Sequence, residues 1–132
     1  MSVPPMLGLR NVKVPVTDLP VALDWYGKVL GFRPTMEFPD SEGVVRGVHG
    51  ELPGIGEVLA LREDPEAARG LGAFAIVNFE VADRAALETW VTHLAGLGVT
   101  HGPIIDTPRL SLLVFCNPDG QEIHLYTPLR SG

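Results

Sequence analysis

An internal repeat is the feature that most limits the possible fold of this chain. NVKVPVTDLPVALDWY (residues 11–26) aligns with IVNFEVADRAALETWV (residues 76–91) at an offset of 65 residues. In both copies an aspartate is followed seven residues later by a tryptophan, and each copy continues to a Leu-Gly pair. A repeat of this length indicates one supersecondary unit that is used twice.

Each copy is predicted to begin with a strand that leads into a helix. Valine or phenylalanine occupies every second position of both strands, which puts these side chains on one face. Asp18 and Asp83 are predicted N-caps, because a carboxylate accepts hydrogen bonds from the free amide groups of the first helical turn. Gly31 and Gly98 suit the left-handed residue that follows a helix. Trp25 and Trp90 lie on the apolar helix faces, so we assign both to the core.

Three shorter extended runs follow each predicted helix, with turn sequences between them. They are residues 32–38, 44–50 and 57–61 in the first copy, and 99–105, 110–116 and 122–126 in the second. The predicted order is therefore βαβββ twice, within one domain spanning residues 1–132. Module one covers residues 7–62, a linker covers 63–72 and module two covers 73–128. The fold class is α+β, in which one helix covers one face of each sheet and the other face lines something else.

The charge balance argues against a nucleic-acid partner. The chain has 16 acidic and 10 basic residues, a net charge of −6, and phosphate backbones are bound by clustered Lys and Arg that it lacks. No apolar stretch is long enough to span a membrane and no secretory signal pattern is present, so we expect a cytoplasmic protein. Cys116, the single cysteine, excludes an internal disulfide, and its place in the apolar run LSLLVFC predicts a core residue.

Three segments carry a resemblance to a known family. VPVTDLPVALDWYGKVLGF, FEVADRAAL and NPDGQEIHLY resemble the vicinal oxygen chelate superfamily, which includes glyoxalase I, extradiol dioxygenases, fosfomycin-resistance proteins and bleomycin-resistance proteins. The resemblance implies two βαβββ modules whose mixed sheets form a cup, each sheet covered by a helix. It also implies that the cup is closed between two subunits, so we expect a homodimer.

Metal-using members of this family hold a divalent ion on the first and last strands of each module. By resemblance, those ligand positions fall on Asn11, Ala60, Ile76 and His124. Ala60 and Ile76 have no donor atom, and Asn11 is a weak donor, whereas a catalytic metal site needs about three protein ligands. We therefore expect no metal cofactor, with His124 as the one plausible retained ligand; the alternative is a divalent metal at His124.

Strand alternation predicts which side chains face the cup. Ile123 and Leu125 are expected on the helix-covered face, and their neighbours on the other face. The predicted ligand-binding residues are Asn11, Lys13, Ile76, Asn78, Glu80, Glu122, His124 and Tyr126. The alternative interpretations are a histidine that is simply a satisfied polar residue, a solvated sheet face for the other residues, and an ion pair between Lys13 and Glu80. His49, in VVRGVHG, is predicted to lie near the rim of the cup.

Three functions are consistent with these residues. The first is a metal-free protein that binds a small organic molecule and sequesters a drug or metabolite, as in antibiotic resistance; no nucleic acid or membrane is involved. The second is a metal-dependent enzyme of glyoxalase or dioxygenase type. The third is a metal-free isomerase or epimerase, with His124, Glu80 or Glu122 as the general base.

Overall fold

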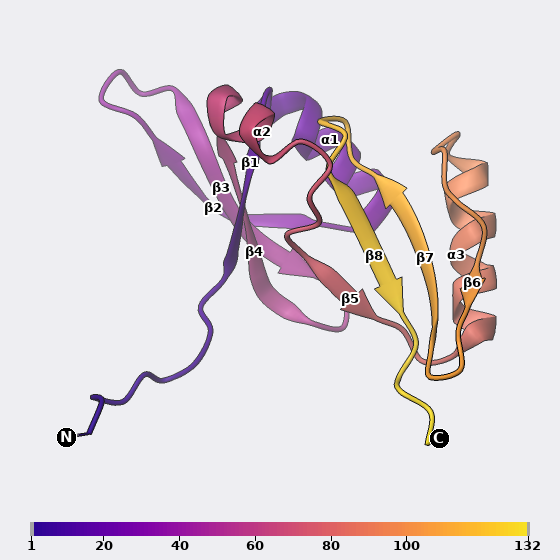
Figure 1. The fold of residues 1–132 in the computed structure, drawn as a ribbon. Helices are drawn as coiled ribbons and strands as arrows, with labels where there is room; N and C mark the ends of the chain where they lie inside the picture. The colour runs from indigo at the N-terminus through magenta and orange to yellow at the C-terminus, as the bar shows by residue number, and fades with distance from the viewer. Residues whose placement is uncertain (1, 132) are drawn as a thin grey trace.

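The predicted βαβββ order is present twice in the computed structural model, which describes residues 2–131. Module one consists of β1 (Val12–Val16), α1 (Leu19–Leu30), β2 (Arg33–Pro39), β3 (Val45–Leu52) and β4 (Gly56–Glu63). Module two consists of β5 (Asn78–Glu80), α3 (Arg84–Gly96), β6 (Ile105–Asp106), β7 (Ser111–Cys116) and β8 (Glu122–Tyr126). The two mixed sheets have the orders β1-β4-β3-β2 and β5-β8-β7-β6, and in each the first pair is parallel. Figure 1 shows the two sheets as separate, open surfaces.

The helix boundaries follow from the capping residues. The carboxylate of Asp18 accepts a hydrogen bond from the amide of Val21, and that of Asp83 accepts one from Ala86. Gly31 and Gly98 have φ angles of +72° and +71°, the left-handed conformation that glycine adopts without a steric penalty. Both predicted caps and both predicted stops are confirmed.

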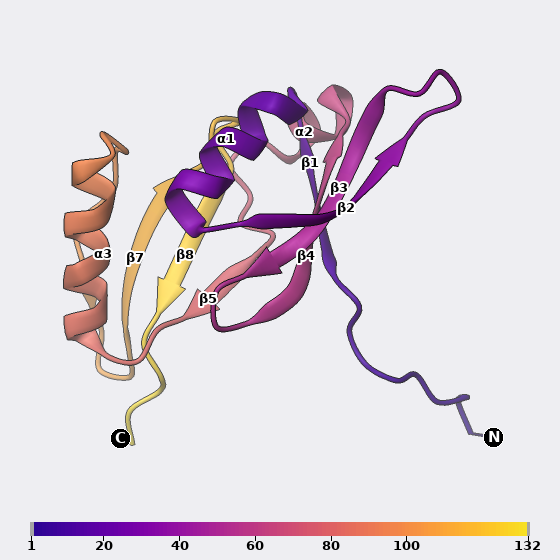
Figure 2. The same ribbon diagram turned by 180° about the vertical axis from the view of Figure 1, so that it is seen from behind.

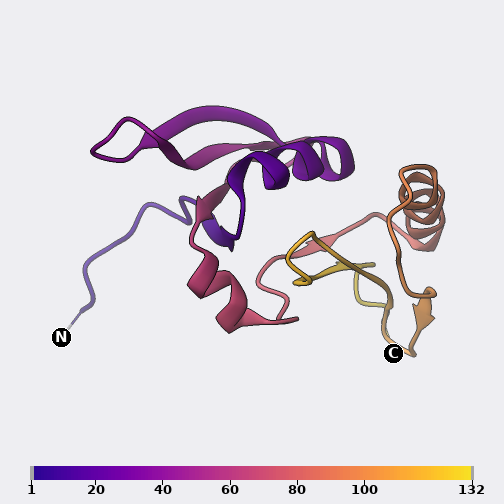
Figure 3. The same cartoon turned by 90° about the horizontal axis from the view of Figure 1, so that it is seen from above.

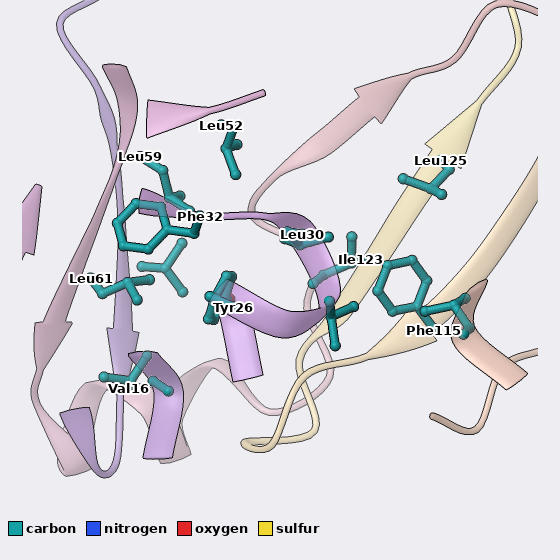
Figure 4. Packing of buried hydrophobic residues seen from close by; sticks show 14 of the residues in the cluster. Val16, Tyr26, Leu30, Phe32, Leu52, Leu59, Leu61, Phe115, Ile123 and Leu125 are labelled. Carbon is teal, nitrogen blue, oxygen red and sulfur yellow. The ribbon is translucent and has the colours of Figure 1, made fainter. Parts of the chain in front are cut away.

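Helix α1 packs between the two sheets. Its buried residues Tyr26 and Leu30 lie between Leu59 and Leu61 of module one and Ile123 of module two (Figure 4). The view from above shows α1 and α3 on the same side of the module-two sheet, with α1 next to module one and α3 away from it (Figure 3). The main apolar core is therefore on the helix side of both sheets, and it includes residues from both modules.

The turn between β7 and β8 fastens module two to module one. Asn117 is buried and donates through Nδ2 to the Tyr26 hydroxyl at 3.0 Å and to Oε1 of Gln121 at 3.0 Å. Nε2 of Gln121 donates to the Pro15 carbonyl at 3.0 Å, and the Asp119 carboxylate accepts from the Thr17 amide. Burial raises the pKa of Tyr26 to about 12. The motif NPDGQ thus forms both a turn and the polar contact between the modules.

Three expectations from the sequence need correction. The linker contains a short helix, α2 (Pro65–Leu71), because Asp64 accepts from the Ala67 amide and Pro65 suits a first turn. The predicted strand 99–105 is reduced to Ile105–Asp106 and one bridge at His101, because Pro103 has no amide to donate. Cys116 is exposed and not in the core.

The amino-terminal residues form an extended arm. Residues 2–11 run away from the sheets with no helix or strand of their own (Figure 2). Four large apolar side chains of this arm are exposed: Val3, Met6, Leu7 and Leu9. In the part of the chain described here, no helix has the length and hydropathy needed to cross a membrane.

Candidate functional site

The cup face of module two is the side of its sheet opposite the helices. Buried and half-buried residues alternate along β8, so that Ile123 and Leu125 point to the core and Glu122, His124 and Tyr126 point to the cup. The register places Asn78, His124 and Val114 in one row across the sheet, and Glu80, Tyr126 and Leu112 in the next. The predicted phase of this strand is confirmed.

Three cup-facing side chains of β8 form a hydrogen-bonded chain. Nε2 of His124 lies 2.8 Å from Oε1 of Glu122, and Nδ1 lies 2.8 Å from the Tyr126 hydroxyl. A carboxylate can only accept, so Nε2 carries the proton toward Glu122, and in the neutral ring Nδ1 accepts from the phenol. This arrangement fixes the tautomer and orientation of the imidazole.

The cup face of module one has a different composition. Lys13, Ala60, His49 and Met36 lie side by side on β1, β4, β3 and β2 and share the face opposite the core. His49 was expected near the rim, and it lies instead in the row across the middle of the sheet. It is only 9 % exposed, and its Nε2 is buried with no hydrogen-bond partner.

Two cations on this face lack a counter-ion. Within residues 2–131, neither Lys13 nor Arg62 lies within ion-pair distance of a carboxylate. Arg62 is opposite Gly47 in the sheet, and its Cδ lies 3.6 Å from where a Cβ at Gly47 would be. The stem of Arg62 therefore lies across β3 in the row next to His49.

The repeat makes the two cup faces comparable position by position. Lys13 is beside Ala60 as Asn78 is beside His124, so Ala60 and His124 are equivalent in the two modules. By the same register His49 is equivalent to Val114. Ala60 and His124, the two positions that the family resemblance assigned to the last strands, are thus counterparts in the repeat, and the first carries only a methyl group.

The donor set does not fit a metal ion. The structure, over its described residues, brings together no group of three His, Cys, Asp or Glu side chains that could hold one. His124 is the single strong donor at the four family positions, and both its ring nitrogens are bonded to neighbours. A catalytic divalent ion needs about three protein ligands, so we derive no step through a metal.

Other predicted site residues are less closely grouped. Asn11 is half-buried and precedes β1, and Asn78 and Glu80 are exposed on the edge strand β5. Ile76 precedes β5, where the strand alternation does not yet hold, and it packs against the core. Lys13 and Glu80 do not form the ion pair that was considered.

A separate groove of about 620 Å³ lies on the helix side. It is lined by residues 28–31 at the end of α1, residues 52–55, residues 79–81 of β5 and its flank, and Trp90 and His93 of α3. Its size suits a small molecule, but most of its polar groups have internal partners. Lys28 pairs with Asp24, and His93 Nε2 lies 2.8 Å from the Val29 carbonyl. Nε2 of His49, the one buried side-chain polar atom without a partner in residues 2–131, is on a cup face, and we take the cup faces as the candidate site.

Two mixed βαβββ sheets with open faces opposite their helices define a duplicated cup-forming fold. The chain belongs to the Glyoxalase/Bleomycin resistance protein/Dioxygenase superfamily, whose family model matches residues 8–125. No curated protein matches the chain.

Solved structures share the fold over nearly the whole chain. The antibiotic binding protein TnmS3 from Streptomyces sp. CB03234 is 23% identical with a TM-score of 0.73, covering 93% of this chain and 97% of its own. Lactoylglutathione lyase from Agrobacterium tumefaciens is 18% identical with a TM-score of 0.73, covering 94% and 96%. The fosfomycin resistance protein FosX from Listeria monocytogenes is 12% identical with a TM-score of 0.68, covering 92% and 93%. At these identities the similarity concerns the fold alone.

Proposed function

We propose that this protein binds a small organic molecule at its cup faces without a metal ion. The observation that carries the proposal is the donor set: the family positions hold Asn11, Ala60, Ile76 and His124, which cannot chelate together. The cup faces nevertheless retain apolar walls with a few polar groups, the usual composition of a ligand pocket. One structural relative is described as an antibiotic binding protein, so drug or metabolite sequestration is the activity we favour.

We also propose that two copies of the chain close the cup. Each cup face lies on the side of its sheet away from α1, so the two modules of one chain share a core and not a cup. Met36 and Phe38, on the module-one face, are 51% and 46% exposed. A homodimer that joins the module-one face of one copy to the module-two face of the other would cover these side chains and the exposed arm.

Binding and metal content can be measured on the same preparation. Protein purified without chelators is analysed for metals and titrated calorimetrically with a panel of aromatic antibiotics before and after EDTA treatment. We expect saturable binding that EDTA leaves unchanged, that His124→Ala weakens, and that Thr92→Ala on the exposed side of α3 does not affect. A near-stoichiometric divalent ion that is lost in His124→Ala would overturn the metal-free function. Light scattering at micromolar concentration should give twice the chain mass of 14.2 kDa, and a monomer mass contradicts the closed cup.

The hydrogen-bonded chain on β8 favours a second candidate, metal-free acid–base catalysis. Nδ1 of His124 can take the proton of the Tyr126 hydroxyl while Glu122 stabilises the resulting imidazolium, so the phenol oxygen can exchange a proton with a bound carbon acid. Isomerisation or epimerisation next to a carbonyl needs this kind of group. NMR detection of deuterium uptake from D₂O into a panel of 2-oxo acids tests it. No uptake above that of the Tyr126→Phe variant rejects this activity.

A further inference from the structure

The imidazole of His49 has an unmet hydrogen bond at a buried position. Its Nε2 is buried and no protein group lies within hydrogen-bond distance, although the residue is 9 % exposed. No other buried side-chain nitrogen or oxygen in residues 2–131 lacks a partner. Buried polar groups in native proteins are nearly always paired, because an unpaired one has lost its hydration without compensation. A partner from outside the chain would remove this cost.

The scaffold does not require histidine here. The equivalent position of module two is Val114, on the same face and in the same register with the last strand. An apolar side chain therefore fits this place in a βαβββ sheet. The two copies of the unit therefore differ at this position, and packing alone does not account for the histidine.

The residue next to His49 in its row is a small one, Ala60, and the residue after that is a cation, Lys13. Ala60 separates His49 from Lys13 within the row, and two strand spacings put their Cα atoms about 10 Å apart. Ala60 has only a methyl group and is 5% exposed, so neighbouring side chains cover it, and a ligand could lie over it only when these side chains move aside. Gly47, in the next row, leaves room for the Arg62 stem beside β3.

The charge at this place is opposite to that of the whole chain. The protein carries a net charge of −6. The other two basic residues on the strands of module one form ion pairs: Arg33 pairs with Glu51, and Arg46 pairs with Asp40 and Glu63. Within the described chain, Lys13 and Arg62 have no such partner. Two cations without a counter-ion and a histidine nitrogen without a partner thus lie in adjacent rows of one sheet face.

We infer that His49, Lys13 and Arg62 form a subsite for the anionic group of the ligand, a carboxylate, phosphate or phosphonate seated over Ala60. The Nε2–H of His49 donates to one oxygen of this group, and the ammonium and guanidinium groups donate to the others. Met36 and Arg62, the long side chains next to His49, rotate on a fast timescale and can open access to Nε2. The inference rests on the proposed binding function and adds the charge of the ligand to it.

A matched pair of probes separates the two proposals. 2-Naphthoate and 2-naphthamide have the same ring system and differ in charge, and both are titrated into the full-length protein by calorimetry. We expect naphthoate to bind about tenfold more tightly than naphthamide, the factor that corresponds to one charge-assisted hydrogen bond. His49→Val and Arg62→Gln should each remove about that factor for naphthoate and leave naphthamide unchanged. Arg69→Gln, a surface cation on α2, is the control and should change neither.

NMR of the imidazole nitrogens gives a readout that does not depend on an organic ring. A long-range ¹H–¹⁵N spectrum resolves the histidines, of which the chain has four, and His49→Val assigns the one in question. Inorganic phosphate should shift the Nε2 resonance of His49 in the native protein and not in Arg62→Gln.

The outcomes distinguish the alternatives. Equal affinity for the two probes leaves small-molecule binding intact and overturns the anion subsite. Binding of neither probe, with no phosphate-induced shift at His49, overturns the subsite, and the antibiotic titration above then decides the binding function separately. If His49→Val instead weakens the dimer and leaves naphthoate affinity unchanged, the partner of Nε2 belongs to the second copy and the inference is wrong.

Discussion

Replacing Tyr26 with phenylalanine should loosen the contact between the two modules. Tyr26 lies on α1, and its hydroxyl accepts a hydrogen bond of 3.0 Å from Nδ2 of Asn117 in the β7–β8 turn. Asn117 is 6% exposed, and its other Nδ2–H is already bonded to Gln121. Tyr26→Phe therefore leaves one N–H donor buried without an acceptor. Such a group costs about 1–3 kcal/mol, and we expect about 2 kcal/mol, because the aromatic ring and its packing are kept.

For a domain of this size the loss corresponds to a fall in Tm of about 8 °C. The measurement is thermal and guanidinium unfolding followed by circular dichroism at a fixed protein concentration. Tyr126→Phe is the matched control, since Tyr126 is the second of two tyrosines and its hydroxyl bonds to His124 on the open cup face. The control should stay within about 0.5 kcal/mol of the wild type. Equal stability of the two variants would refute the conclusion that the hydrogen bonds of this turn stabilise the contact between the modules.

The pH dependence tests the burial of the same tyrosine side chain. Burial is the main cause that raises the pKa of Tyr26 to about 12 in the folded protein, from an ordinary value of 10.0. The unfolded chain therefore releases this proton first, and the folded state loses stability as pH rises from 10 to 12. A shift of two units corresponds to about 2–3 kcal/mol. The free energies of unfolding of the wild type and of Tyr126→Phe should both decline over this range, and the decline should be about 2–3 kcal/mol smaller in Tyr26→Phe.

Three further predictions concern other parts of the chain. Gly31→Ala should lower the free energy of unfolding by about 2 kcal/mol and Gly98→Ala by about 1 kcal/mol, measured with guanidinium. Both glycines have a left-handed φ, but only at Gly31 would the new Cβ lie 2.9 Å from Pro53. Equal losses would contradict the predicted clash with Pro53. Cys116 is exposed, and its partial burial and the nearby Glu122 carboxylate raise the pKa of its thiol. The native protein should therefore react fully with a maleimide, faster as pH rises. A thiol that reacts only after unfolding contradicts this placement. Deletion of residues 2–9 removes the exposed apolar side chains of the arm and should weaken the proposed dimer at least tenfold in sedimentation equilibrium; an unchanged dissociation constant would exclude the arm from the interface.

Much of the fold could be predicted because its signals are local. The repeat, the capping aspartates and the alternation along residues 122–126 each depend on a few neighbouring positions, and the structure confirms them. The linker helix escaped prediction although Asp64 and Pro65 are an N-cap and a first-turn residue, because seven residues give little periodicity. Cys116 was assigned by the apolar character of its run, whereas the alternation with buried Phe115 decides which face it occupies.

The site could be predicted only in part, because it depends on the register between strands. Alternation correctly placed His124 with Glu122 and Tyr126 on one face, but the two hydrogen bonds among them depend on rotamers. The position of His49 depends on its pairing with Ala60, eleven residues further along the chain, and with Met36 on the other side. Comparing His49 with its repeat counterpart Val114 was the available signal, and it requires the strand register to be known.

The position of α1 between the sheets has a consequence for the halves of the chain. A fragment that ended after β4 would keep every backbone pairing of its own sheet, yet it would expose the side of α1 that Ile123 and Phe115 cover in the intact protein. Such a fragment could hide that stripe only by associating with another molecule. We therefore expect the two modules to fold as one cooperative unit, in which joining the halves converts what would be an intermolecular interface into an interior.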